Sequence, residues 1–120
     1  MTATSINSGD TELLTIDVTG NSAIARLTVS GEVDSSSAPA LRARLDDVLD
    51  KGAVELTIDL TRVTFLDSAG LCVLAAAHRR SLRADVRLRV LASTRAVIRP
   101  MQITGLYDLL HVATEESGAA

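Results

Sequence analysis

Several kinds of residue are scarce in this chain of 120 residues, which contains one cysteine, two prolines, no tryptophan and only two aromatic residues, Phe65 and Tyr107. With Cys72 alone, no intramolecular disulfide and no cysteine-based metal site can form. No apolar run approaches the roughly 20 residues that a membrane span needs. The first ten residues also lack the charged-then-apolar pattern of a signal peptide. We therefore expect a cytoplasmic protein without direct membrane insertion.

The residues that are present favour a folded domain that does not bind nucleic acid. Hydrophobic residues make up 47% of the sequence, which is enough for a core of Leu, Val, Ile and Ala. The formal net charge is −3. The arginines are scattered and have no aromatic platform beside them, so neither phosphate attraction nor base stacking is indicated.

Hydrophobic periodicity predicts the order of the secondary structure. Alternating apolar residues predict strands at 12–18, 23–29, 54–60, 86–92 and 109–113, with a Gly20-Asn21 turn between the first two. Helical spacing predicts helices from Pro39 to a cap at Gly52, from 68 to 83, and from 94 to 104. Residues 61–67 are expected to form a loop. The predicted order is ββαβαβαβ.

This order predicts one α/β domain at residues 12–113, between a flexible lead at 1–11 and a flexible tail at 114–120. Strand–helix–strand units imply a mostly parallel central sheet, with an antiparallel N-terminal strand and helices packed on it. In such sheets, sites gather at the carboxyl edge of the strands. That edge should hold Asp34 with Ser35, Ser36 and Ser37, then Asp67 with Ser68, then Ser93 with Thr94.

The segment 65–71, Phe-Leu-Asp-Ser-Ala-Gly-Leu, has the most chemical character in the chain. One interpretation is purely structural: Asp67 or Ser68 caps a helix, and Gly70 lets the backbone pack closely. A second interpretation is functional, because Ser68 would project from a helix N-terminus, where a phosphate is tolerated.

The helix after Ser68 is expected to have an unusually apolar outer side. Its sheet-facing residues should be Leu71, Leu74, Ala75, His78 and Leu82. Ser68, Cys72 and Ala76 would then lie on the opposite side, flanked by Ala69 and Val73. A small, apolar outer surface is typical of a face that docks a partner. The predicted partner-binding residues are Asp34, Ser35, Ser36, Ser37, Asp67, Ser68, Ala69, Gly70, Cys72, Val73 and Ala76.

From about residue 12 to residue 113 the chain resembles the STAS domain of bacterial anti-sigma factor antagonists. The resemblance lies in Gly-Glu-Val-Asp at 31–34, Ala-Pro-Ala-Leu at 38–41, Ile-Asp-Leu at 58–60 and, above all, the segment 65–71. It implies a STAS-like α/β fold and a serine that an anti-sigma factor with kinase activity phosphorylates, here Ser68. The residue after this serine is often Ser or Thr in the family and is Ala69 here.

The resemblance further implies a partner-switching cycle. The unphosphorylated antagonist binds the anti-sigma factor and frees a sigma factor, phosphorylation ends the complex, and a phosphatase resets the protein. No cofactor and no enzymatic activity are expected. The alternative is a STAS subunit that regulates a membrane transport system or another signalling complex.

Other chemistries are less well supported by the sequence. A serine hydrolase would need a Gly-x-Ser-x-Gly elbow, but Leu66 occupies the first glycine position. The two histidines, His78 and His111, are expected far from Ser68. Asp34 and Asp67 could hold Mg²⁺ at one sheet edge, although helix capping explains them better. Cys72 could sense redox state, although a small contact residue is the simpler interpretation.

Overall fold

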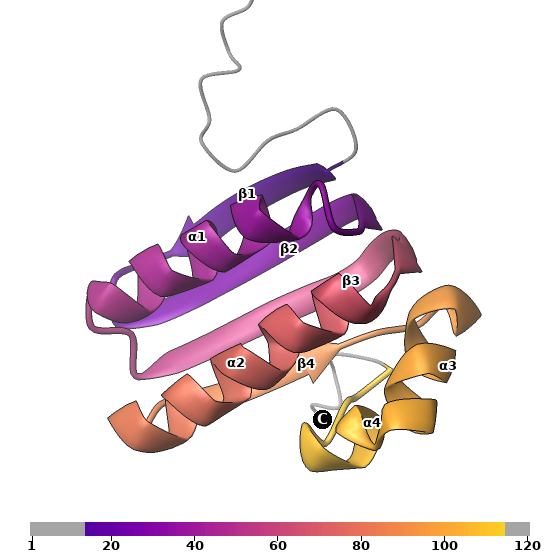
Figure 1. The fold of residues 1–120 in the computed structure, drawn as a ribbon. Coiled ribbons are helices and arrows are strands. Elements are labelled where there is room, and N and C mark those ends of the chain that lie inside the picture. Colours follow the sequence, from indigo (N-terminus) through magenta and orange to yellow (C-terminus); the bar gives the residue numbers. More distant parts are fainter. Residues whose placement is uncertain (1–13, 115–120) are drawn as a thin grey trace, which may run out of the picture.

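The computed structural model describes residues 14–114, and the predicted lead at 1–11 lies outside them, as does the predicted tail beyond Thr114. The elements follow the expected order through the third long helix (Figure 1). Their bounds are β1 Leu14–Gly20, β2 Ile24–Val33, α1 Ala38–Asp50, β3 Glu55–Leu66, α2 Ser68–Ala84, β4 Arg87–Leu91, α3 Arg95–Thr104 and α4 Leu106–Leu109.

The four strands form one mixed sheet in the order β1-β2-β3-β4. The β1–β2 hairpin is antiparallel, whereas β2, β3 and β4 run parallel, as predicted. Helices α1 and α2 lie side by side across one face of the sheet, whereas α3 packs against β3 and α4 packs against α3 (Figure 1). The predicted α/β class and mixed sheet are confirmed.

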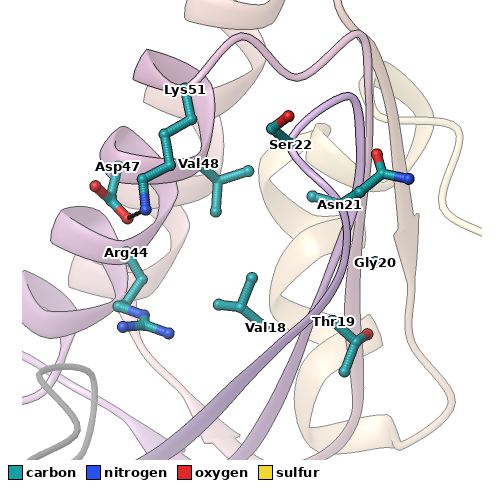
Figure 2. A pocket seen from close by; sticks show the side chains of 10 residues that line it. Val18, Thr19, Gly20, Asn21, Ser22, Arg44, Asp47, Val48 and Lys51 are labelled. Atoms are coloured by element: carbon teal, nitrogen blue, oxygen red, sulfur yellow. Dashed lines mark ion pairs between the residues drawn. The ribbon is translucent and has the colours of Figure 1, made fainter.

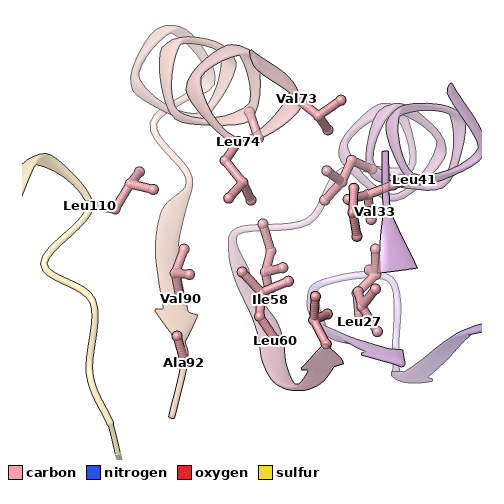
Figure 3. Close-up of a cluster of buried hydrophobic side chains, with 14 of the residues drawn as sticks. Leu27, Val33, Leu41, Ile58, Leu60, Val73, Leu74, Val90, Ala92 and Leu110 are labelled. Atoms are coloured by element: carbon pink, nitrogen blue, oxygen red, sulfur yellow. The ribbon is translucent and has the colours of Figure 1, made fainter. Parts of the chain in front are cut away.

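The core lies between the sheet and the α1–α2 layer (Figure 3). Alternate strand residues such as Leu27, Ile58 and Val90 are fully buried and meet Leu41 and Leu74 from the helices. Burying a side chain of this size contributes about 1.5–3 kcal/mol. With so few aromatics, aliphatic packing of this kind holds the fold.

The opposite face of the sheet carries polar side chains, and one of its carboxylates, Asp59, is buried. Burial alone would raise the pKa of Asp59, but hydrogen bonds from the Thr61 hydroxyl and backbone, together with Arg26, lower it below its ordinary value. Arg26 Nη2 lies 2.5 Å from Asp59 Oδ2, and the Thr61 hydroxyl donates at 2.6 Å to Oδ1. The Asp59 carboxylate on β3 therefore has its charge paired with Arg26 of β2, and this ion pair links the two strands.

The prediction of a loop at 61–67 is wrong, because β3 continues to Leu66. The register between β2 and β3 shifts between Thr28 and Ser30, and again between Gly31 and Glu32. Each shift places an extra residue in β3, which is the signature of a β-bulge. Two bulges break the period-two pattern, so the alternation stops while the pairing continues.

The predicted last strand at 109–113 is reduced to a single parallel bridge between Leu91 and Ala113. Leu106–Leu109 forms the short helix α4 instead. Leu106 and Leu110, one helical turn apart, are both buried. Their spacing favours a helical turn over an extended strand.

Candidate functional site

The carboxyl ends of β2 and β3 lie together, as the predicted topology requires. Val33 pairs with Leu66, and the Asp67 amide donates to the Val33 carbonyl at 3.1 Å. Asp34 and Asp67, which follow these two strand ends, therefore share one edge of the sheet. The loop after β4 reaches the same strand, because the Thr94 hydroxyl donates to the Val63 carbonyl at 3.2 Å.

The start of α2 is capped by Asp67 and not by Ser68. Asp67 Oδ1 accepts hydrogen bonds from the amides of Ala69 at 2.9 Å and Gly70 at 3.3 Å. Ser68 is the first helical residue and is exposed. Its hydroxyl makes no hydrogen bond within residues 14–114. The fold therefore uses the aspartate and leaves the serine hydroxyl unused.

Close packing sets the position of this helix start. A Cβ added at Gly70 would lie 2.4 Å from Leu66 Cδ1 and 2.8 Å from Val33 Cγ1, both closer than real contacts allow. A glycine at position 70 lets α2 begin directly above the ends of β2 and β3. Ser68 is thereby held in a fixed place at the sheet edge.

The start of α1 is built differently, from a closed set of hydrogen bonds. Asp34 Oδ1 accepts from the Ser36 hydroxyl at 2.7 Å and from the amides of Ser36 and Ser37 at 2.9 and 3.1 Å. These bonds, the Ser36 hydroxyl first among them, lower the pKa of Asp34. Ser37 Oγ donates to the Glu32 carbonyl at 2.8 Å and accepts from the Asp34 amide.

The predicted surface residues are only partly exposed. Ser35, Ser36, Ser68 and Cys72 are exposed, and Asp34, Asp67, Ala69 and Ala76 are half-buried. Ser37 and Gly70 are buried, so they belong to the packing below the sheet edge and not to its exposed surface. Val73 is also buried, so the prediction that it flanks the exposed outer side of α2 is wrong.

The error at Val73 has a physical cause: α2 is rotated relative to its predicted orientation. Its buried residues are Gly70, Val73, Leu74, Ala77 and Ser81, whereas Leu82, expected in the core, is exposed. Helix α2 packs on α1 as well as on the sheet, so its buried stripe turns toward α1. Figure 3 shows Val73 directed to the α1 side and Leu74 toward the strands.

One exposed residue near the site was not predicted as part of it. Phe65, two residues before Asp67, pairs with Glu32 and is 46% exposed. Leu66 faces the helices and is buried, so Phe65 points to the other side of β3. The sequence did offer a signal for including Phe65 in the site, because the chain's only phenylalanine lies two residues before the Asp67-Ser68 pair.

The two histidines lie away from Ser68. Both line a hollow beside Leu82 and Leu110, at the C-terminal half of α2. His78 follows Ser68 by ten residues, or about 15 Å along a helix. Within residues 14–114, no three His, Cys, Asp or Glu side chains gather closely enough to share a metal ion. No helix in that range combines the length and apolar character needed to cross a bilayer.

A separate hollow of about 290 Å³ lies at the opposite end of the sheet (Figure 2). It is bounded by the Gly20–Asn21 turn, by Arg44 and Val48 of α1, and by Lys51, which directly follows α1. Asn21 Oδ1 closes the turn by accepting from the amides of Ala23 and Ile24. None of the predicted site residues lines this hollow.

The comparisons with known proteins agree with this geometry. The sequence pattern of one family, described as STAS domain, matches residues 15–119. The chain belongs to the STAS domain family. It is 30% identical over 105 residues to the anti-sigma-B factor antagonist of Bacillus subtilis, covering 88% of this chain and 95% of that protein. It is 33% identical over 93 residues to the anti-sigma-F factor antagonist RsfB of Mycobacterium tuberculosis, covering 78% and 75%.

Solved structures extend the agreement to three dimensions. A crystal structure of an anti-sigma factor antagonist from Mycobacterium paratuberculosis has a TM-score of 0.81 and 33% identity, covering 88% of this chain and 90% of that one. The unphosphorylated form of SpoIIAA shares the fold, with a TM-score of 0.73 at 20% identity and 88% and 93% coverage. This STAS chain is thus a member of the anti-sigma factor antagonists, as the resemblance at residues 65–71 predicted.

Proposed function

We propose that this STAS protein binds an anti-sigma factor with serine kinase activity while Ser68 is unmodified, and that phosphorylation of Ser68 ends the complex. A phosphatase then restores the binding form. The protein acts in the cytoplasm as a binding protein and not as an enzyme. The names of its relatives support the partner class, since they are antagonists of anti-sigma factors.

One observation carries the proposal: Ser68 is exposed, and its hydroxyl makes no hydrogen bond within residues 14–114. A kinase can therefore phosphorylate this hydroxyl without breaking a hydrogen bond of the fold. The neighbouring hydroxyls of Ser36 and Ser37 are bonded to Asp34. Modifying either of them would disrupt the start of α1.

The local charges support an electrostatic switch. The amides of Ala69 and Gly70, which would otherwise receive a phosphate, are already bonded to Asp67. A phosphate at Ser68 therefore adds nearly two negative charges next to the carboxylate of Asp67, at the sheet edge that also holds Asp34. An interface that excludes water from this edge must then desolvate an unpaired charge, which costs several kcal/mol.

Site mapping tests the proposal. The protein is incubated with ATP and the purified kinase that it binds, and phosphorylated residues are located by mass spectrometry. Label at Ser68 alone is expected. Label at Ser35, Ser93 or Thr94, with Ser68 unmodified, would overturn the assignment.

A further inference from the structure

A groove of about 110 Å³ runs between α1 and α2 and is rich in arginine. Helix α1 contributes Arg42 to its lining, and α2 contributes Arg79, Arg80 and Arg83. Ala76 also lines the groove and lies two helical turns after Ser68 on the same side of α2. The groove therefore continues the surface that begins at Ser68.

Acidic groups neutralise only part of this charge. Arg80 donates to Asp46 at 3.1 Å and also to Asp50, and Arg42 lies 3.9 Å from the same Asp46. Arg79 and Arg83 are exposed, and neither has an ion-pair partner among residues 14–114. The chain as a whole has a net charge of −3, so this groove is a local positive surface on an acidic protein.

We propose that this groove binds an acidic segment of the anti-sigma factor, an inference that rests on the function proposed above. Guanidinium groups pair with carboxylates through two parallel hydrogen bonds. The floor between them is apolar, formed by Leu45, Val73 and Ala77, and suits an aliphatic side chain beside the carboxylates. Ser68 and Arg83 lie about 22 Å apart along α2, so one partner surface covers both.

A protein segment fits this groove better than a nucleic acid does. No aromatic side chain lines the groove, so bases have nothing to stack on. A nucleic acid would also extend beyond the groove over the rest of an acidic molecule. An acidic peptide segment needs only the short positive groove.

Charge reversal tests the proposal. The variant Arg79→Glu/Arg83→Glu is compared with the matched control Arg89→Glu/Arg99→Glu, which reverses two exposed arginines of β4 and α3. Binding to the purified anti-sigma factor that the wild type binds is followed by surface plasmon resonance at 50 and 300 mM NaCl. A labelled 20-nucleotide single-stranded DNA is tested in parallel by fluorescence anisotropy. Thermal melting monitors the fold, and Arg79→Gln/Arg83→Gln replaces the first variant if its melting temperature falls.

We expect the Arg79/Arg83 variant to bind at least tenfold more weakly at 50 mM NaCl, chiefly through slower association. Its affinity should depend less on salt than that of the wild type, and the control should stay within twofold. Equal binding by the Arg79/Arg83 variant and the wild type would overturn the proposed binding role of the groove. An equal loss of binding in the control would overturn it too. Either result would leave the proposed function intact. DNA binding that depends on Arg79 and Arg83 would assign the groove to nucleic acid. A wild type that binds no anti-sigma factor would overturn the proposed function itself.

Discussion

The two helices that cover the sheet begin with the same residue types and use them in opposite ways. At α1, Asp34 and the hydroxyls of Ser36 and Ser37 form a closed set of hydrogen bonds, and Ser37 is fully buried. At α2, Asp67 alone caps the helix, and the Ser68 hydroxyl has no such role. Of Ser36, Ser37 and Ser68, only Ser68 has a hydroxyl without a hydrogen bond in the described chain, so we expect it to be the modified one of the three. A residue that is reversibly phosphorylated should not take part in the hydrogen bonds that hold the fold together.

The largest expected effect tests which side of α2 faces outward. Val73→Glu buries a charge against α1 and should lower the free energy of unfolding by about 3–5 kcal/mol. Ala76→Glu adds the same charge to a half-buried position beside Arg79 and Arg80, and should leave stability nearly unchanged. It should instead weaken binding to the anti-sigma factor at least tenfold. Urea unfolding and calorimetry measure the two properties, and equal stability of both variants would contradict the rotated α2.

A charge at Ser68 should affect binding more than stability. Ser68→Asp places a carboxylate at a helix N-terminus, where the helix dipole favours it. At the interface the same charge should cost roughly 2–4 kcal/mol, or about 30- to 1,000-fold in affinity. Ser22→Asp, at the exposed hairpin turn, is the matched control and should bind like the wild type. If both variants lose affinity equally, the effect is not local to the α2 edge.

The two helix starts should also differ when a serine is removed. Ser37→Ala leaves the Asp34 amide and the Glu32 carbonyl without their partner and should lower the free energy of unfolding by about 1–3 kcal/mol. Ser68→Ala should stay within about 0.5 kcal/mol, because it removes no hydrogen bond. Because Ser68→Ala cannot be phosphorylated at this position, it should also keep binding the anti-sigma factor in the presence of ATP. Denaturant unfolding measures the stability of both variants. Similar losses of unfolding free energy would contradict the difference between the two helix starts.

The smallest effect concerns pH. Hydrogen bonds from Ser36 and Ser37 lower the pKa of Asp34 in the folded state. The ionised carboxylate therefore stabilises the fold above the unfolded pKa of about 3.9, and this contribution is lost as the pH falls through the lower folded pKa. The stability difference between wild type and Asp34→Asn should shrink between pH 7 and pH 3. A difference that stays constant in urea titrations at both pH values would contradict this role.

Local periodicity predicted most of the fold but not its irregularities. The alternation in β1, β2 and the first half of β3, and the Asp-Ser start of α2, were readable because each depends on neighbouring residues. The bulges of β3 were not, since an extra residue breaks the pattern without ending the pairing. The rotation of α2 was missed because it depends on α1, which the sequence of α2 does not encode.

The sequence predicted where the candidate site lies but not the role of each serine in it. The topology placed Asp34 and Asp67 at one edge, and the structure brings them together there. The sequence could not separate a structural serine from a free one, because Ser37 and Ser68 both precede or begin a helix. Burial and the hydrogen bonds of Ser37 to Glu32 and Asp34 distinguish it from the exposed Ser68.

The most direct measurement is the affinity of the anti-sigma factor for the unmodified protein and for the same protein phosphorylated at Ser68, by isothermal titration calorimetry. The phosphate carries nearly two charges, so its effect should exceed that of Ser68→Asp. We expect phosphorylation to weaken binding by at least about 100-fold, or about 2.7 kcal/mol, with an unchanged melting temperature. Equal affinity of the two forms would contradict the claim that Ser68 is the switch.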